Sequence, residues 1–165
     1  NYNKTEITDL PGDQTEILPT GQVGGKLFEY FVYRYAGVNP SNGELLFLKA
    51  NGDLTESPNV DTDRVWSDKN IFPDYQGSFG FTADYKGFFL STQFNYVVGV
   101  DRWDSDLSDF QDPTSVGQFR SSTDLLRAWT PDNRVTDIPS LTASNFPLGG
   151  NSDRYLTDAD YIRLR

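Results

Sequence analysis

Carboxylates are the side chains of this sequence with the greatest capacity for chemistry, and they are densest in one short segment. The chain carries 24 Asp and Glu against 14 Lys and Arg, a formal net charge of -10. Hard oxygen ligands at short spacing could bind calcium, although a run of charges is more often a solvated loop. The spacing lacks the glycine and the glutamate of an EF-hand loop, which favours the solvated loop. The aspartates of this segment are Asp101, Asp104, Asp106, Asp109 and Asp112.

Other routes to catalysis are few. The sequence contains no Cys and no His, which removes thiol nucleophiles, Cys and His zinc sites and imidazole bases from consideration. Two carboxylates about 5–9.5 Å apart could hydrolyse a glycoside, but the acidic residues fall in loop-like segments without a patterned partner. We therefore predict that the chain is not an enzyme and uses no cofactor and no metal. A pI near 4.3 and the lack of a basic stripe argue against nucleic acid as a partner.

Segment 88–100 has the strongest periodicity in the chain. A two-residue period is typical of a β-strand. At about 3.3 Å per residue the segment would reach roughly 40 Å, which suits a tilted strand that crosses a bilayer. Phe89 and Val97 are the exceptions to this alternation. The mostly apolar set is Phe88, Leu90, Thr92, Phe94, Tyr96, Val98 and Val100, and the polar or small set is Ser91, Gln93, Asn95 and Gly99.

Segment 78–85 alternates in the same way and precedes the turn Tyr85-Lys86-Gly87. Its apolar set is Phe79, Phe81, Ala83 and Tyr85. Gly87 can adopt the positive φ that short hairpin turns require. The two segments therefore predict an antiparallel hairpin with one apolar and one polar face.

The rest of the chain predicts strands separated by long irregular segments and one short helical turn, at 122–129. The strands are expected at 26–36, 44–49, 78–85 and 88–100, with a last one entering at Tyr155. The opening residues are polar and strand-like, and 161–165 alternates like the start of a strand. We therefore expect an all-β, antiparallel fold in which residues 1–165 are one partial domain of a longer protein.

Four groups of residues occur in an order and spacing that resemble a known family. They are Tyr33-Arg34-Tyr35-Ala36-Gly37-Val38-Asn39-Pro40-Ser41-Asn42-Gly43, then Tyr85-Lys86-Gly87-Phe88, then Arg127-Ala128-Trp129-Thr130-Pro131 with Thr136-Asp137-Ile138-Pro139, and finally residues 154–165. From about Gly21 onward the sequence resembles the C-terminal part of SusC/RagA-type TonB-linked (TonB-dependent) outer-membrane transporters.

The resemblance implies a fold and a function. Members form a large transmembrane β-barrel of 22 strands with an N-terminal plug, and this chain would be a partial C-terminal portion without the plug or the closing strands. The parent protein would be an integral, multi-pass β-barrel in the outer membrane of a Gram-negative bacterium. It would import nutrients, either glycans (oligosaccharides) or peptides, with a SusD-like surface lipoprotein and with energy supplied through TonB.

The same resemblance assigns positions to the predicted elements. Segments 37–76 and 101–154 would be extracellular loops, and the turn at Lys86 would be periplasmic. Trp103 and Trp129 would contact the lipoprotein or the substrate, and Trp103 has an alternative interpretation as an interfacial aromatic residue. If the apolar face contacts outer-membrane lipid, the polar residues of these strands face the lumen. There they would line the substrate route, contact the plug or simply be solvated. These residues are Asp84, Ser91, Gln93, Asn95, Arg163 and Arg165.

Two other classes of protein remain open from the residues alone. A soluble carbohydrate-binding β-sandwich would also alternate apolar and polar residues and would place aromatic rings in its loops. Its strands normally follow one another at intervals of about 8–12 residues, which the long irregular segments here do not match. A surface adhesin is a third possibility that composition does not separate from the others.

Overall fold

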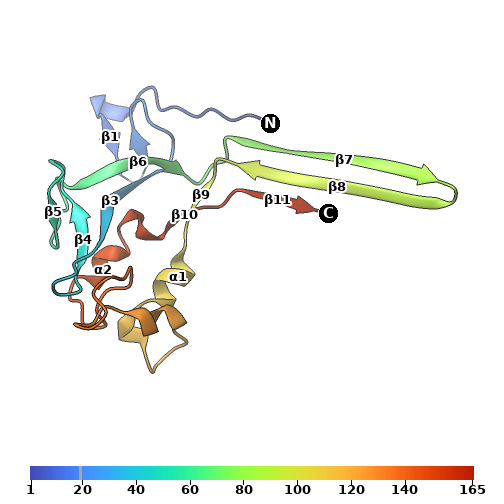
Figure 1. The fold of residues 1–165 in the computed structure, drawn as a ribbon. Helices are drawn as coiled ribbons and strands as arrows, with labels where there is room; N and C mark the ends of the chain where they lie inside the picture. The colour runs from blue at the N-terminus through green and yellow to red at the C-terminus, as the bar shows by residue number, and fades with distance from the viewer. Residues whose placement is uncertain (19) are drawn as a thin grey trace. The chain divides into compact units, whose positions relative to one another are not determined.

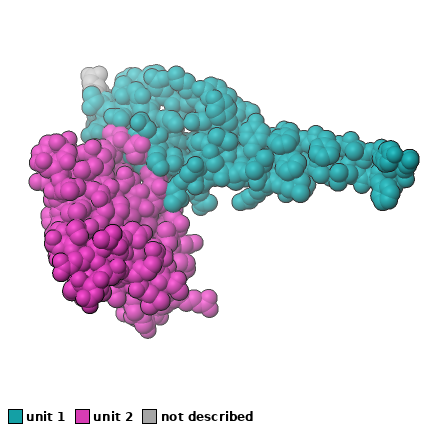
Figure 2. Space-filling view, in the orientation of Figure 1, with its two compact units in different colours: residues 1–30, 68–102, 157–165 teal, residues 31–67, 103–156 magenta. Residues whose placement is uncertain are grey.

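The computed structural model describes residues 1–18 and 20–165 and consists mostly of β-strands (Figure 1). The chain divides into two compact units, coloured separately in Figure 2. Unit 1 comprises residues 1–30, 68–102 and 157–165, and unit 2 comprises residues 31–67 and 103–156. Among the described residues, no helix has the length and the apolar character needed to cross a membrane.

The elements are short, apart from β3 and the two strands of one hairpin. The strands are β1 (Glu16–Ile17), β2 (Gly21–Gln22), β3 (Glu29–Val38), β4 (Leu45–Leu48), β5 (Leu54–Thr55), β6 (Arg64–Asn70), β7 (Tyr75–Tyr85), β8 (Phe88–Val98), β9 (Asp101–Trp103), β10 (Leu156–Asp158) and β11 (Tyr161–Leu164). The α-helices are α1 (Ser105–Phe110) and α2 (Phe146–Gly149), and the 3-10 helices are η1 (Pro11–Asp13), η2 (Pro113–Ser115), η3 (Thr123–Arg127) and η4 (Asp153–Tyr155).

The predicted hairpin is confirmed as β7 and β8, the most extended element of unit 1. The two strands pair antiparallel without a register shift, from Tyr75 opposite Val98 to Tyr85 opposite Phe88. Lys86 and Gly87 both have positive φ, 49° and 88°, as expected of a two-residue turn that matches the twist of the strands. The turn therefore fixes the register of the whole hairpin.

Strand β11 extends this sheet on the side of β8, which gives the order β11-β8-β7 (Figure 1). Arg163 lies opposite Asn95, and Leu164 lies opposite Phe94. The pairing continues past β11, because the backbone N–H of Arg165 donates to the carbonyl oxygen of Gln93 at 2.7 Å. The predicted last strand is thus present, although the structure divides it into the short strands β10 and β11.

The free edge of β7 also begins to pair, at the end away from the turn. Tyr2 forms an antiparallel bridge with Tyr75. The nitrogen of Asn1 donates to the carbonyl oxygen of Gln76 at 2.8 Å, and the N–H of Gln76 donates back to Asn1 at 3.0 Å. Extended backbone therefore lies on both sides of the hairpin at this end.

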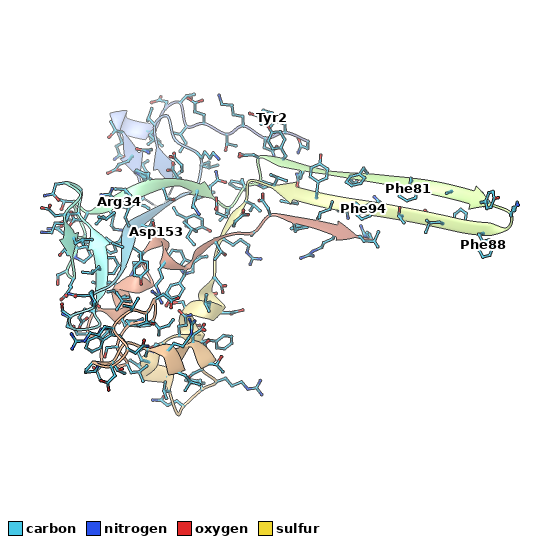
Figure 3. The ribbon with its side chains drawn as sticks, in the orientation of Figure 1. Tyr2, Arg34, Phe81, Phe88, Phe94 and Asp153 are labelled. Carbon is cyan, nitrogen blue, oxygen red and sulfur yellow. The ribbon has the colours of Figure 1, made fainter. Side chains whose placement is uncertain are left out.

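Directly paired residues of a sheet share a face, so the register sorts the side chains into two sets. Phe79 stacks on Phe94 with ring centroids 5.1 Å apart on one face, whereas Ser78 lies opposite Asn95 on the other. The predicted separation of apolar and polar faces is confirmed. Every side chain from Phe79 to Ser91 is exposed, and Phe88 at the turn end is 80% exposed (Figure 3). This part of the hairpin has no core on either face.

Unit 2, in contrast, has a hydrophobic core. The strand order of its sheet is β5-β4-β3-β6. Tyr33, Leu45 and Phe47 form the buried cluster, and Leu45 and Phe47 are completely buried. The side chain of Asn145 connects the loop before α2 to β4, because it accepts from the N–H of Leu45 and donates to its carbonyl oxygen, both at 2.9 Å.

Three features of this region were not foreseen from the sequence. Segment 37–76 is not one long irregular loop, since β5 and β6 also lie within it. The strand expected at 26–36 is β3, but it pairs in the sheet of β4 and not in the sheet of the hairpin. Helix α1 was not predicted, and it begins where Asp104 accepts a hydrogen bond from the N–H of Leu107 at 2.9 Å. The short helical turn after Ser122 is confirmed as η3.

We predict that the core of unit 2 depends on Phe47. Phe47→Ala should lower the free energy of local opening around β4 by about 3–5 kcal/mol, because it removes a completely buried ring and leaves a cavity. The control is Leu54→Ala in the adjacent β5, where the side chain is 58% exposed and the change should be within about 0.5 kcal/mol. Amide hydrogen exchange of β4 in the intact protein measures both, and equal effects would contradict this assignment of the core.

Candidate functional site

The polar face of the three-stranded sheet brings the predicted lumen-facing residues onto one surface. Asn95 and Arg163 lie opposite each other, and the backbone of Arg165 bonds to Gln93. Ser91 lies opposite Thr82, and their hydroxyl oxygens are 3.4 Å apart. Asp84 shares the face but lies at the turn end, opposite Phe89. The arginines therefore occupy the half of the face away from the turn, and the carboxylate of Asp84 occupies the turn end.

A shallow hollow of about 300 Å³ lies at the half of this sheet that carries the arginines. Among the residues that line it are Gln76, Ser78, Asn95 and Tyr161. The ring of Tyr161 supports Arg163, whose guanidinium carbon is 4.5 Å from the ring centroid. Sequence reasoning did not name Tyr161, Gln76 or Ser78, because their place beside Asn95 follows only from the pairing of β7, β8 and β11.

The apolar face has a different composition along its length. Phe79, Phe81 and Phe94 occupy the middle, Tyr75 lies at the end away from the turn, and Tyr85 lies opposite Phe88 at the turn end. Figure 3 labels Phe81, Phe94 and Phe88. Tyr75 and Tyr85 are ten residues apart, about 33 Å along the strand, and a tilt of about 40° reduces this to roughly 25 Å, the height of the apolar band of a membrane barrel. At the end away from the turn, the rings of Tyr75 and Tyr2 have centroids 4.9 Å apart.

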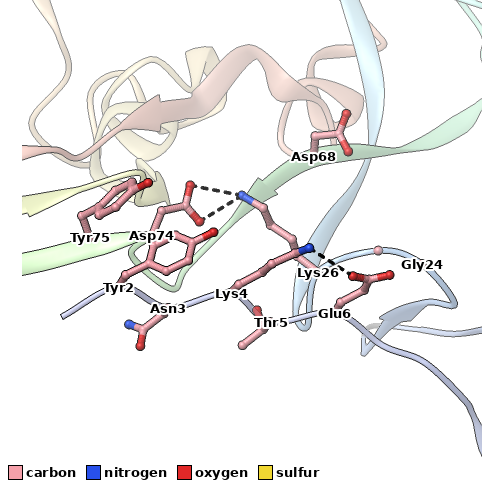
Figure 4. Close-up of a pocket in the computed structure, with 11 residues that line it drawn as sticks. Tyr2, Asn3, Lys4, Thr5, Glu6, Gly24, Lys26, Asp68, Asp74 and Tyr75 are labelled. Carbon is pink, nitrogen blue, oxygen red and sulfur yellow. Dashed lines mark hydrogen bonds and ion pairs between the residues drawn. The ribbon is translucent and has the colours of Figure 1, made fainter.

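A second hollow of unit 1, of about 380 Å³, is lined by two lysines and by the three carboxylates of Glu6, Asp68 and Asp74 (Figure 4). Lys26 pairs with Asp74 at 3.4 Å, and Lys4 pairs with Glu6 at 3.6 Å. Exposed pairs of this kind contribute little to stability. Since these cations and anions pair with one another, the hollow offers weak attraction to a charged ligand.

The acidic segment after β8 uses its carboxylates in local structure. Asp101 pairs with Lys69 at 3.4 Å, and Asp104 caps α1. Asp112 caps η2 and accepts from the N–H of Thr114 at 2.8 Å. Within the described part of the chain, no three His, Cys, Asp or Glu side chains gather as a metal site would require.

The two tryptophans that were predicted to contact a partner lie in unit 2. The indole nitrogen of Trp129 donates to the carbonyl oxygen of Pro40 at 3.2 Å. Its ring lies over Gly43, where an added Cβ would come within 2.7 Å of the ring carbons. Trp103 ends β9 and is half-buried. Trp129 therefore packs against the turn after β3, a role that the sequence did not reveal.

A further hollow of unit 2, of about 580 Å³, lies between Tyr35 and the loop that follows η3. Burial raises the pKa of the Tyr35 hydroxyl above its usual value, and the nearby Arg154 guanidinium offsets only part of this rise. The protonated hydroxyl accepts a hydrogen bond from Arg154 and donates to the carbonyl oxygen of Asp137 at 3.4 Å. Beside this hollow, Val135 is 94% exposed, so an apolar side chain of this loop points to solvent.

Comparison with known proteins decides the family. No family model matches the chain. Two curated proteins of Formosa agariphila are similar: TonB-dependent receptor P39, 33% identical over 127 residues and 74% of this chain, and TonB-dependent receptor P3, 26% identical over 180 aligned positions and 96% of this chain. Solved structures of the RagAB peptide importer in its closed-closed and open-open states match 99% of this chain with a TM-score of 0.84, at 28% and 27% identity.

This chain is a segment of a TonB-dependent transporter of the SusC/RagA type. It spans 12% and 16% of the length of the two receptors and 19% and 18% of the two solved chains. The all-β, antiparallel fold predicted from the sequence is confirmed by the match to these structures. The relatives are named as receptors and importers, not as enzymes.

The structure gives a physical reason for two of the sequence groups that resemble this transporter family. The group that ends at Gly43 and the group around Trp129 are far apart in the chain, but they contact each other directly. The N–H of Ser140 also donates to the carbonyl oxygen of Gly43 at 2.9 Å. The turn after β3 and the loop after η3 are thus one packed substructure of the transporter.

We predict that this contact requires a glycine at position 43. Gly43 has a φ of 79° and no room for a Cβ beneath Trp129, whereas Gly52 has a φ of 89° and open space around it. Gly43→Ala should therefore destabilise the segment by about 1–3 kcal/mol more than Gly52→Ala, which suffers the backbone strain alone. Amide exchange over residues 39–48 in the intact protein measures the difference, and indistinguishable variants would disprove the steric argument.

Proposed function

We propose that this chain forms part of the barrel wall and of the outer loops of an outer-membrane importer that takes up nutrients with energy supplied through TonB. The apolar face of the β7-β8-β11 sheet supports this proposal most directly. It carries large apolar side chains that no described residue covers, including Phe81 and Ile162. A contiguous exposed surface of this kind marks an interface, and its phenylalanine middle and tyrosine ends fit a bilayer.

The free edges of the sheet support a barrel rather than an isolated sheet. Along β7 from Gly77 to Tyr85, and along β8 from Phe88 to Thr92, the outer edge has no strand partner among the described residues. Backbone groups cannot remain unpaired in hydrocarbon, so further strands of the same transporter must continue the sheet. We therefore assign residues 1–165 to a partial C-terminal portion of a 22-stranded barrel of the kind described for this class.

The hairpin also suggests a direction in the membrane. Short turns of bacterial outer-membrane barrels lie on the periplasmic side and long connections lie outside the cell. The turn at Lys86 and Gly87 would then be periplasmic. Segments 37–74 and 101–156, which join the strands at the other end of the hairpin, would be extracellular. In this orientation the lumen receives the side chains of the polar face, Asp84, Ser91, Gln93, Asn95, Arg163 and Arg165.

The soluble β-sandwich alternative is less compatible with this sheet. A sandwich covers one face of each sheet with a second sheet packed about 10 Å away. Among the described residues, no second layer buries the side chains from Phe79 to Ser91. The relatives also carry the names of receptors and importers.

The cargo and the partners follow by analogy with the similar proteins. The solved structures are named as a peptide importer, so we propose peptides as the cargo, with oligosaccharides as the alternative. The partner would be a SusD-like surface lipoprotein that contacts the outer loops. The exposed Val135 and Leu126, which is 88% exposed, are candidates for this contact, as are Trp103 and Trp129, the second of which also packs on the turn at Gly43.

We predict a strong asymmetry between two adjacent positions of β8. Phe94→Arg places a charge on the lipid face near the middle of the hairpin and should cost about 2–4 kcal/mol of membrane-inserted stability. Asn95→Arg places the same charge on the lumen face, opposite Arg163, and should cost at most about 1 kcal/mol from repulsion between two exposed like charges. Urea titrations of the complete protein folded into lipid vesicles measure both. Equal costs would mean that the sheet does not separate lipid from water.

Transport itself can be measured in cells that express the complete transporter and its lipoprotein. A radiolabelled octapeptide of alanine, serine and threonine should accumulate inside the outer membrane. Accumulation should stop when the proton gradient is collapsed or TonB is deleted, because uptake through a plugged barrel needs energy from the inner membrane. Uptake that continues unchanged without TonB would refute the proposed function.

A further inference from the structure

We infer that the hollow beside Arg163 is a subsite for a free carboxylate of the cargo, specifically the C-terminal carboxylate of a peptide. This inference rests on the proposed function, since it requires that the polar face lines the route of the cargo. It adds a ligand group and named residues to that route. The residues that line the hollow include Tyr161 of β11, Asn95 of β8, and Gln76 and Ser78 of β7, and Arg163 lies beside it on the Tyr161 ring.

The guanidinium of Arg163 is held in place before any ligand binds. Tyr161 and Arg163 are two residues apart on one strand, so their side chains point to the same face. The guanidinium lies over the Tyr161 ring at 4.5 Å, a cation–π contact that restricts a side chain which is otherwise free to rotate. A stacked guanidinium keeps its edge N–H groups available, and this edge is the part that pairs with a carboxylate through two parallel hydrogen bonds.

The charge of Arg163 is not compensated by any described residue. Among the described residues, no carboxylate lies within ion-pair distance of Arg163 or Arg165, although the chain has ten more acidic than basic side chains. Since only Lys4, Lys26, Lys69 and Arg127 have an acidic partner among the described residues, what distinguishes Arg163 is its stacked position beside the hollow. Arg163 of β11 and Arg165, the residue that follows this strand, can therefore attract an anion from outside this segment.

The other residues of the hollow suit the polar groups of a peptide. The side-chain amides of Asn95 and Gln76 each present a donor and an acceptor, which match the carbonyl and N–H groups of a peptide backbone. Asn95 is the cross-strand partner of Arg163, so the two side chains leave the same face of the sheet. A neutral sugar could use the amides, but it would leave the guanidinium without an anion, and for this reason a peptide carboxylate fits better.

The position along the hairpin is consistent with capture rather than release. In the proposed orientation the hollow lies in the outer half of the lumen wall, because Tyr161 is opposite Val97 and far from the turn. Asp84, the acidic side chain on the same face, lies opposite Phe89, about six residues or roughly 20 Å nearer the periplasm than Asn95. A cargo carboxylate is thus attracted at the outer half and repelled at the turn end.

Binding to the purified complete transporter, together with its lipoprotein, tests the subsite. The probes are an octapeptide of alanine, serine and threonine with a free C-terminal carboxylate and the same peptide with a C-terminal amide, compared by isothermal titration calorimetry. The wild type should bind the carboxylate form about tenfold more tightly, as expected for one charge-assisted pair. Arg163→Gln should abolish this preference, and Arg163→Lys should keep part of it. The matched control is Arg102→Gln, an exposed arginine of β9, which should retain the full preference.

Two outcomes would overturn the inference. Equal binding of the two peptides by the wild type would mean that no carboxylate site exists. An equal loss of both peptides in Arg163→Gln would mean that Arg163 contacts another part of the transporter, such as a plug carboxylate, and not the cargo. The uptake assay separates this result from the proposed function. If the wild type prefers the carboxylate peptide but uptake does not depend on TonB, only the proposed importer function is contradicted. If uptake depends on TonB but the two peptides bind equally, only the carboxylate subsite is contradicted.

Discussion

The backbone ladder between β7 and β8 is the constraint on which the functional surface depends. Its register runs unbroken from Tyr75 and Val98 to Tyr85 and Phe88. A slip of one residue would move every apolar side chain of one strand to the opposite face. The positive φ values of Lys86 and Gly87 prevent such a slip, because they set a two-residue turn. Gly80 also favours this register, because β7 and β8 approach so closely there that an added Cβ would come within 2.4 Å of the carbonyl oxygen of Thr92.

The two units of the chain are stabilised in different ways. Unit 2 buries Leu45 and Phe47 and connects its loops to β4 through Asn145, so much of its stability is internal. The hairpin of unit 1 has no such core, and an isolated hairpin in water is at best marginally stable. In the proposed barrel its stability would come from apolar surroundings on one face and from neighbouring strands at its edges. The exposed phenylalanines of the hairpin are therefore a stronger argument for contact with a bilayer than the composition of the chain.

The sequence predicted those parts of the structure in which the pattern is local. Alternation alone identified the hairpin and placed Ile162 and Arg163 on opposite faces, because a two-residue period can be recognised within a single segment of sequence. Strand β6 was missed, because its sequence does not alternate clearly. Its first residue, Arg64, donates to the carbonyl oxygen of Phe31 and packs its guanidinium 4.9 Å from the ring of that residue. Such contacts between distant segments leave no periodic signal.

The candidate site was predicted in part for the same reason. Asn95 and Arg163 were each placed on the polar face from their own strands, but no sequence pattern indicates that they lie opposite each other. Tyr161 was overlooked although it is two residues from Arg163, since its function as a support for the guanidinium appears only when the strand is formed. The packing of Trp129 on Gly43 was not foreseen, because this contact crosses 86 residues of sequence.

The central claim is that the β7-β8-β11 sheet separates lipid from a wet lumen, and nitroxide accessibility measures this most directly. Single spin labels at each position from Phe88 to Val98 would be placed in the complete transporter in lipid vesicles. Accessibility to oxygen, which concentrates in the bilayer, should be high at Leu90 and Phe94 and low at Ser91 and Asn95. Accessibility to a water-soluble nickel chelate should show the opposite pattern. Equal accessibility to the chelate at all of these positions would contradict the account.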